Sequence, residues 1–593
     1  MDTAFREVEE HFPDCLKWVL SSYGVEAELV LGENIILSRA GFHQGDPLAG
    51  LLFSLVLQPI IDKIQFEIPS LKFNGWYLDD GCLVGRKEDL RKAVDIIRQE
   101  GPARGLHLST SATVRPPCQP KSTVWLPNPD NADLDPLQRG IPRIEEGGFK
   151  LLGTPIGSPQ FIEETIKKRI QKVREITEKL PLLQDAQTEF VLLRSCLSTP
   201  KMMYSLRTTD PTSLQELWRE YDDITMVALN NMLGTPVNRT QWMQAQLPVS
   251  LGGIGLKGAE DHATAAFAAS LLSSQELKEK LLNLPEDDCP THLSAALLAQ
   301  LSIKQGEEAT KENLTGVPQR AISLKINLHN HQLLTEHTTS TGVQRDIARL
   351  ASLTVPHSGD WLNVLPSPNL GLHLRTAEWI ISVKYRLGLP VFSTAGACPA
   401  CHSFSDKEGD HAISCGQEGE RIARHNHLRD TLYHTAVSAA LGPTREGRAL
   451  IPGTEARPAD VLIPNWCAGK DAAMDVTVVN PLQARMIDQA AVHAGHSLTV
   501  RFNDKMSKHG EACRREGMVF IPLVVETLGG WEEQADVQIK RLGAALARQT
   551  GQDESDKIRH VFQSLAVRLA KGNAALFLNR TPSFPNPEVD GQE

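Results

Sequence analysis

The stretch that decides the fold is GFHQGDPLAGLLFSLVLQPII at 41–61, followed by NGWYLDDG at 74–81. Asp79 and Asp80 lie side by side between the apolar runs GWYL and CLVG, which predicts a tight β-hairpin with both acids at its tip. We expect Gly81 to supply the backbone freedom that the sharp turn needs. Two carboxylates held rigidly at such a tip are suited to binding metal ions.

The first of these segments predicts a long buried helix. Asp46 is placed to cap it, Pro47 suits its first position, and the residues from 48 to 61 are almost wholly apolar. An acidic turn and a buried helix are each common, so neither identifies a function by itself. Their order and spacing carry more information than either element.

Together the two segments resemble the palm of a reverse transcriptase from a non-LTR (LINE-type) retrotransposon. The resemblance implies that the YLDDG turn binds catalytic Mg²⁺ through Asp79 and Asp80. It also implies that the QGDPL segment approaches the template and the incoming dNTP. The nucleotide- and template-binding residues are then Gln44, Gly45, Asp46, Pro47 and Tyr77.

The composition is that of an ordinary soluble multidomain protein. Of 593 residues, 41% are hydrophobic and 22% charged, and we expect three or four domains. No apolar run reaches the roughly 18–20 residues of a membrane span, the longest being 48–61. The N-terminus has the pattern of neither a signal nor a transit peptide. The scattered cysteines favour a reducing intracellular compartment, the nucleus if the protein is functional.

The net charge of −11 argues against strong nucleic-acid binding, because backbone phosphates demand compensating Lys and Arg. Two stretches are nevertheless locally basic, KKRIQKVR at 167–174 and RFNDKMSKHGEACRR at 501–515. The first lies in a helix expected from 158 to 180. Its basic face suits either a thumb that grips a duplex or an ordinary solvated surface.

A third feature is the pattern C-x2-C-x9-H-x3-C, formed by Cys398, Cys401, His411 and Cys415. Three thiolates and one imidazole satisfy tetrahedral Zn²⁺, and four protein ligands make the zinc structural. The alternative is four unligated residues in a loop. The pattern resembles the zinc knuckle that precedes the endonuclease of site-specific non-LTR retrotransposons.

A second pair of acids follows, in ARPADVLIP at 456–464 and AAMDVTVVNP at 472–481. Both segments predict short buried strands, in which Asp460 and Asp475 form either a divalent-metal site or ordinary acids beside turns. The arrangement resembles the core of PD-(D/E)xK restriction-like nucleases. The resemblance implies that the two acids hold Mg²⁺ or Mn²⁺ beside the scissile phosphate.

The nuclease lysine of that family normally lies two residues after the second acid, where this chain has Thr477. The retrotransposon branch takes the lysine from a later helix, which implies Lys505 or Lys508. Their spacing predicts that both lie on one helix face.

Two further positions near these acids stay open. Glu526 is either another functional acid or a residue at the edge of the domain. His425 and Asn426 are expected to be structural residues near the start of a helix.

The sequence thus predicts an α+β multidomain protein with a partial right-hand polymerase palm, a helical thumb, a helical linker, a zinc knuckle and an α/β restriction-like nuclease core. The expected boundaries in that order are 1–157, 158–270, 271–395, 396–420 and 421–535, then C-terminal helices at 536–580 and a disordered tail at 581–593.

In the resembling family the first palm aspartate and the fingers lie upstream of FREVEEHFP, where this chain starts. We therefore expect a truncated protein with an inactive polymerase and with the nuclease as its active centre. The implied partners are duplex DNA and retrotransposon RNA, with no membrane and no small-molecule substrate apart from dNTPs. The alternatives are a non-catalytic nucleic-acid-binding protein and a relic without a selected function.

Overall fold

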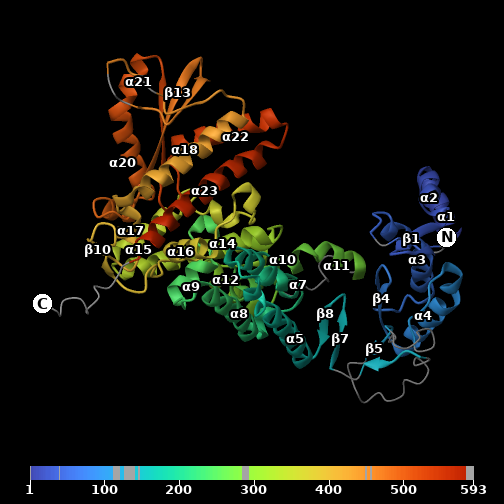
Figure 1. Ribbon diagram of the computed structural model, residues 1–593. Coiled ribbons are helices and arrows are strands. Elements are labelled where there is room, and N and C mark those ends of the chain that lie inside the picture. The colour runs from blue at the N-terminus through green and yellow to red at the C-terminus, as the bar shows by residue number, and fades with distance from the viewer. Residues whose placement is uncertain are drawn as a thin grey trace. The chain divides into compact units, whose positions relative to one another are not determined.

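The computed structural model has a mixed α and β fold, dominated by helices and completed by small sheets (Figure 1). This confirms the general α+β class predicted from the sequence. The chain divides into two compact units. The N-terminal unit comprises 1–168 with 271–292, and the C-terminal unit comprises 169–270 with 293–593.

The residues that the structure describes are 2–38, 41–43, 45–110, 121–125, 140–144, 147–282, 293–447, 450–453 and 457–581. Gln44 and almost all of the tail predicted to be disordered lie outside them. The domain boundaries expected from the sequence stay predictions.

The N-terminal unit combines helices with two-stranded sheets. Strands β1 and β2, β3 and β4, and β7 and β8 pair antiparallel, whereas β5 and β6 pair parallel. The helices are α1 (Asp2–His11), α2 (Leu16–Tyr23), α3 (Ala49–Glu67), α4 (Lys87–Glu100) and α11 (Gln275–Leu282). The strands are β1 (Ala27–Leu31), β2 (Asn34–Ser38), β3 (Phe73–Tyr77), β4 (Asp80–Val84), β5 (Val124–Trp125), β6 (Arg143–Ile144), β7 (Gly148–Leu151) and β8 (Thr154–Gly157).

The predicted hairpin is formed by β3 and β4, which pair with Tyr77 opposite Asp80. The role expected of Gly81 is wrong, because Leu78 is the residue that takes a positive φ, of 54°, in the turn. Gly81 instead lies within β4 opposite Trp76. A Cβ atom at Gly81 would stand 2.4 Å from the Trp76 ring, so glycine is needed there to let the indole lie across the strand.

The start predicted for the long helix is also wrong. Because α3 begins at Ala49, Asp46 is not its N-cap and Pro47 precedes the helix. The Asp46 carboxylate accepts a hydrogen bond from the Leu48 N–H at 2.9 Å through Oδ1 and another from the Tyr23 hydroxyl through Oδ2. Asp46 therefore braces the turn that leads into α3.

Helix α3 continues past its predicted end and, at 19 residues, is long and apolar enough to cross a membrane. The sequence prediction did not anticipate this. It is the single such helix in the described part of the chain, and core helices of soluble proteins meet the same test. Here Ile60 and Ile64 pack in a small core with Ala93 and Ile97 of α4.

The C-terminal unit is mostly helical. Its helices before the sheet, the first of which begins in the N-terminal unit, are α5 (Pro159–Thr177), η3 (Leu180–Leu183), α6 (Ala186–Leu192), α7 (Thr199–Thr208), α8 (Gln215–Leu233), α9 (Arg239–Gln246), α10 (Ala259–Ser273), α12 (Ala295–Gln305), α13 (Lys311–Leu314), α14 (Gln319–Ser340), α15 (Gln344–Leu353), α16 (Thr376–Leu387), α17 (Asp410–Ser414) and α18 (Glu420–Ser438). The later ones are α19 (Ile487–Val492), α20 (His496–Lys505), the π-helical turn η11 (Met506–Gly510), α21 (Glu511–Arg515), α22 (Glu533–Thr550) and α23 (Glu554–Asn579).

A four-stranded sheet in the order β11-β12-β13-β14 organises the second half of this unit. Strand β12 pairs antiparallel with β13, and β13 pairs parallel with β14. A separate two-stranded sheet precedes it. The strands are β9 (Gly396–Ala397), β10 (Phe404–Ser405), β11 (Thr444–Arg445), β12 (Val461–Cys467), β13 (Lys470–Val479) and β14 (Val519–Glu526).

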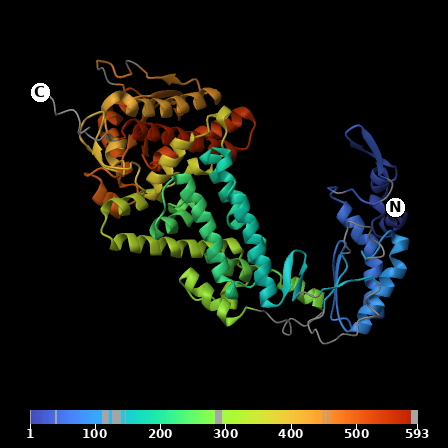
Figure 2. The same ribbon diagram turned by 60° about the horizontal axis from the view of Figure 1, so that its bottom comes forward.

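Helices cover both faces of the sheet. Met474 and Val476 of β13 pack in a core with α18, α22 and α23. On the other face, Val479 of β13 and Val524 of β14 pack with Leu498 of α20. Helix α23 crosses the middle of the unit against α16, α18 and α22 (Figure 1, Figure 2). Alternation along β13 therefore directs Asp475 to the face covered by α20.

Candidate functional site

Asp460 is held at the entrance to β12 by main-chain and side-chain bonds. Its N–H donates to the Met474 carbonyl at 2.8 Å. Its carboxylate accepts from the Val476 N–H at 2.7 Å through Oδ2, and Oδ1 lies 3.1 Å from Nε2 of His425. Both carboxylate oxygens are therefore positioned by neighbouring strands and by α18.

Asp475 lies within β13 and is only 7% exposed. The Lys505 ammonium, at the end of α20, stands 3.1 Å from Oδ1 and 2.8 Å from Oδ2. The Thr477 hydroxyl donates to Oδ2 at 3.0 Å. A buried carboxylate needs such partners, because an unpaired charge loses its hydration without compensation.

Asp460 and Asp475 lie in the same part of the C-terminal unit. Val476, which bonds Asp460, directly follows Asp475 in the chain. The hydrogen bond with Asp460 raises the pKa of His425, burial opposes that shift, and the charge of Asp475 also raises it. The structure thus places Asp460, Asp475, His425 and Lys505 together.

Lys508 forms no ion pair with Asp460 or Asp475 among the described interactions, and it lies in the π-helical turn η11 that follows α20. The regular α-helical spacing that would place Lys508 on the face of Lys505 is interrupted there. Lys508 is exposed; burial lowers the pKa of the neighbouring His509, and the charge of Lys508 lowers it further. The charge of Asp475 acts on His509 in the opposite direction.

The structural role expected of His425 stays a prediction, and the structure places its imidazole against Asp460. His425 is the sixth residue of α18, one turn before Leu428 and two before Leu432, both of which are buried against the sheet. This spacing at i, i+3 and i+7 is the signal that places His425 on the inner face of the helix.

The donor set suits a divalent cation held partly by water or by substrate oxygens. Asp460 and Asp475 offer the oxygen ligands that Mg²⁺ and Mn²⁺ prefer. Within the described ranges, no third His, Cys or acidic side chain joins them in a compact ligand group. The remaining positions around such an ion would therefore fall to water and phosphate oxygens.

Glu526 ends β14, an outer strand of the sheet, and a functional role for this acid stays a prediction. It is fully buried at the end of β14, four positions beyond Pro522, which pairs with Asp475. That separation is roughly 13 Å along the strand. Its Oε1 accepts from the Ser497 hydroxyl at 2.8 Å, and burial raises the pKa of Glu526 to about 7.

The predicted zinc ligands converge. Ligand atoms of Cys398, Cys401, His411 and Cys415 lie within 4.8 Å of one another, with Cys401 Sγ 3.2 Å from His411 Nε2. Hydrogen bonds from the backbone and hydroxyl of Ser403 lower the pKa of the Cys401 thiol to about 6, which favours the thiolate. This cluster fits tetrahedral Zn²⁺.

Arg580, which the sequence did not single out, supports that fit. It is fully buried, donates to Glu420 at 2.7 Å, and its Nε and Nη1 have no hydrogen-bond partner in the described structure. Burial lowers the pKa of Arg580, but the hydrogen bond with Glu420 and the charges of Glu420 and Cys415 raise it above its ordinary value. Three thiolates around one Zn²⁺ leave a net negative charge, and a buried guanidinium compensates it.

The first pair of acids is different. Asp79 and Asp80 are exposed, as is Tyr77 at 66%. The two segments that carry the palm resemblance do meet, because a Cβ at Gly50 would lie 3.8 Å from Cδ2 of Leu78. In the described residues of the N-terminal unit, however, no third ligand groups with these acids to hold a metal ion.

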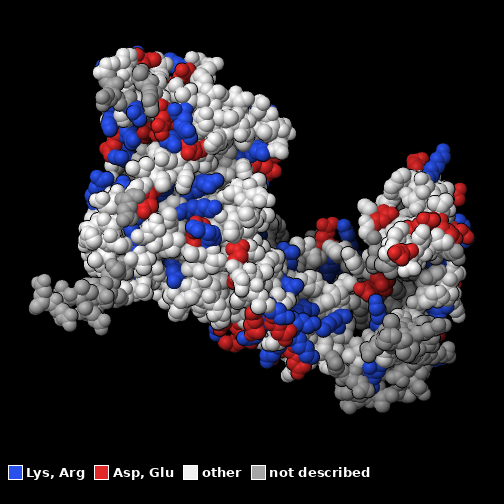
Figure 3. Space-filling view, viewed as in Figure 1, with Lys and Arg blue, Asp and Glu red and all other residues white. Residues whose placement is uncertain are grey.

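Cationic side chains collect where the sequence showed no basic run. Burial lowers the pKa of Lys571, the charge of Glu378 opposes that shift, and the nearby Arg568 and Arg375 lower the pKa further. Lys and Arg gather on this part of the surface, over α16 and α23 (Figure 3). Of the predicted basic stretches, Arg515 is paired with Glu511 at 3.2 Å and Lys167 with Glu163 at 2.5 Å.

Comparison with known proteins gives a distant likeness. No protein-family model matches the chain. Over 223 residues it is 22% identical to the 132 kDa protein of the SLACS retrotransposable element of Trypanosoma brucei gambiense. The match covers 37% of this chain and 17% of that protein's length. The chain is thus distantly similar to part of a retrotransposon protein.

Proposed function

We propose that this chain is a retrotransposon protein whose C-terminal unit cleaves duplex DNA with the help of a divalent metal ion at Asp460 and Asp475. The observation that carries the proposal is the ion pair between Lys505 and Asp475, which joins residues 30 positions apart. The similarity to the SLACS protein supports a retrotransposon origin and hence nucleic-acid partners.

Each residue of the group has a part in the proposed reaction. Asp460 and Asp475 would hold Mg²⁺ or Mn²⁺, which, when bound, supplies an activated water and neutralises phosphate charge. Lys505 stands against Asp475, so its ammonium can donate to a phosphate oxygen as negative charge develops. His425 and the Val476 N–H keep the Asp460 carboxylate oriented without rearrangement.

The Cys–His cluster is proposed to be a structural zinc centre that braces the same unit. Its four protein ligands leave no open coordination position for a substrate. The Ser414 hydroxyl, next to Cys415, accepts from the Asn480 amide at 2.8 Å, directly after β13. Zinc at the cluster would therefore help to fix the end of the strand that carries Asp475.

The test is nicking of supercoiled plasmid DNA by the full chain in MgCl₂ or MnCl₂. Asp475→Asn should abolish nicking, because it removes the charge that holds the metal ion. Asp504→Asn is the matched control, since Asp504 adjoins Lys505 in the chain but is 59% exposed. Equal nicking by wild type and Asp475→Asn would overturn the proposal. Duplex binding without cleavage by wild type would favour the non-catalytic alternative.

A further inference from the structure

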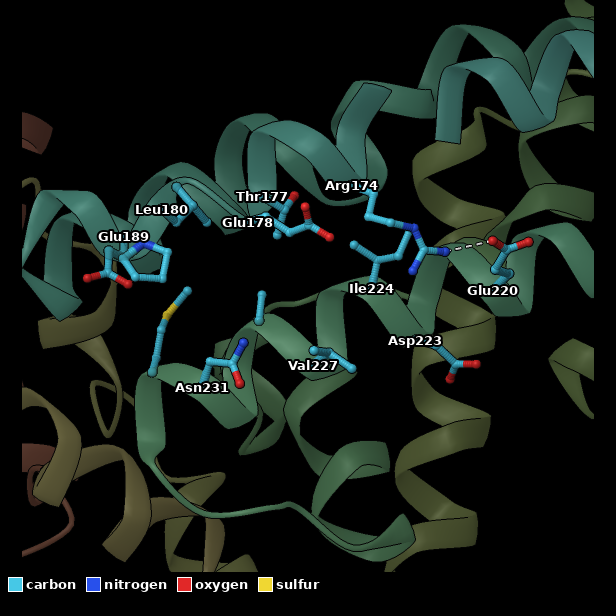
Figure 4. Close-up of a pocket in the computed structure, with 13 residues that line it drawn as sticks. Arg174, Thr177, Glu178, Leu180, Glu189, Glu220, Asp223, Ile224, Val227 and Asn231 are labelled. Carbon is cyan, nitrogen blue, oxygen red and sulfur yellow. Dashed lines mark hydrogen bonds and ion pairs between the residues drawn. The ribbon is translucent and has the colours of Figure 1, made fainter. Parts of the chain in front are cut away.

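A cavity of about 350 Å³ lies within the C-terminal unit, between α5, η3, α6 and α8 (Figure 4). Its volume falls in the range of about 300–1,000 Å³ found for small-molecule sites. Part of its wall is apolar, formed by Leu180, Pro181, Ile224, Val227 and Met232. The cavity belongs neither to the acid group nor to the Cys–His cluster.

The charges around this cavity are mostly negative. Glu178, Glu189, Glu220 and Asp223 line it, against one cation, Arg174. Arg174 is already neutralised by Glu220, its ion-pair partner at 2.7 Å. Glu189 and Glu220 lie at opposite ends of the cavity, and Glu178 points into the space between the helices (Figure 4). An anionic ligand would be repelled.

Two buried polar groups in the wall lack partners. Glu189 is 7% exposed, and among the described interactions its carboxylate has no hydrogen bond or ion pair. Burial, and then the charge of Asp185, raises the pKa of Glu189. Thr177 is 6% exposed and its Oγ1 has no hydrogen-bond partner. Leaving such groups unsatisfied costs free energy, which a ligand rich in N–H donors would recover.

We propose that the cavity binds an aliphatic polyamine. Ammonium groups donate to Glu189 at one end of the wall and approach Thr177 and Glu178 further along it, while the methylene segments between them cover the apolar residues (Figure 4). A neutral ligand would leave Glu189 uncompensated. A single divalent cation is not suited to the site, because no three acidic side chains in the described structure of this region converge on one point.

The test is calorimetric titration of the full chain with spermidine at about 150 mM salt, where non-specific attraction is screened. Wild type should bind spermidine at one site, and Glu189→Gln should weaken binding by at least about tenfold. The matched control, Glu175→Gln, removes an exposed acid of α5 outside the cavity and should leave affinity unchanged. Uncharged 1,8-octanediol should not compete.

Further measurements test the polyamine site if one variant folds poorly. Thr177→Val should also weaken spermidine binding, and Glu189→Gln without ligand should melt at the same temperature as wild type or higher, because it removes an unpaired buried charge. If Glu189→Gln and Glu175→Gln lost spermidine affinity equally, binding would reflect diffuse attraction to an acidic protein. That result would overturn the proposal. Tighter binding of a lysine peptide than of spermidine would do the same, assigning the cavity to a protein partner.

Discussion

The two acid pairs of this molecule differ in how they are held. Asp79 and Asp80 occupy a turn in the N-terminal unit, where both residues are exposed to solvent. Asp460 and Asp475 lie against a sheet in the C-terminal unit and are bound by His425 and Lys505 respectively. The first pair is recognisable from its motif alone. The second pair is identified by its partners, because acids held against a sheet require compensating groups.

The largest effect is expected from disrupting the Cys–His cluster, which we propose braces the unit that carries the second pair. Cys398→Ser should release the zinc, whose binding contributes on the order of 10 kcal/mol in small zinc modules. Metal analysis of the reduced protein should find about one zinc ion per chain in wild type and none in the variant. Cys196→Ser, an exposed cysteine outside the cluster, is the control. Wild-type protein without zinc would contradict the assignment.

The next effect separates the two pairs directly. Asp475→Ala should lower metal-dependent DNA cleavage by about 10³-fold or more, because it removes a metal ligand and the partner of Lys505. Asp79→Ala should leave cleavage unchanged. Rates of plasmid nicking measure both. If the two substitutions reduced cleavage equally, the contrast between the pairs would be lost.

A third acid allows a comparison within the C-terminal unit. The pKa of Glu526 is raised to about 7 by burial, so the folded protein holds a proton that the unfolded chain releases near pH 4.5. The raised pKa of Glu526 therefore stabilises the folded state below pH 4.5, and this contribution is lost as the pH rises through 7. The free energy of unfolding falls over this interval by at most on the order of 3 kcal/mol. Glu526→Gln should flatten the decline in melting temperature between pH 5 and 8, measured by calorimetry.

A control for that experiment is Asp475→Asn, whose carboxylate is paired with Lys505. Asp475→Asn should not flatten the decline in melting temperature between pH 5 and 8. A Glu526→Gln variant whose melting temperature falls with pH as steeply as that of wild type would show that Glu526 is ionised in the folded protein.

The smallest expected effect concerns the first pair. We predict no templated DNA synthesis on a primed RNA or DNA template, because Asp79 and Asp80 lack a third ligand among the described residues. Incorporation of labelled dNTPs should equal that of the Asp79→Ala, Asp80→Ala double variant. Synthesis lost in the double variant would prove this wrong and show that another acid completes the site.

Local sequence patterns predicted the local structures well. The apolar runs around Asp79 and Asp80 indicated the hairpin, and the apolar strings around Asp475 indicated buried strands. The patterns failed where a distant side chain decided the conformation. Gly81 serves the Trp76 ring rather than the turn. Asp46 bonds Tyr23, so that it braces a turn rather than capping α3.

The sequence by itself determined the Cys–His ligand group and the acid pairs, because residue type and short spacing limit what thiols and carboxylates can do. Only the tertiary structure decided which partners meet: Lys505 rather than Lys508 at Asp475, His425 at Asp460, and Arg580 beside Cys415. These contacts join positions far apart in the chain. They form because helix packing on both faces of the sheet, not local propensity, sets where each charge is buried.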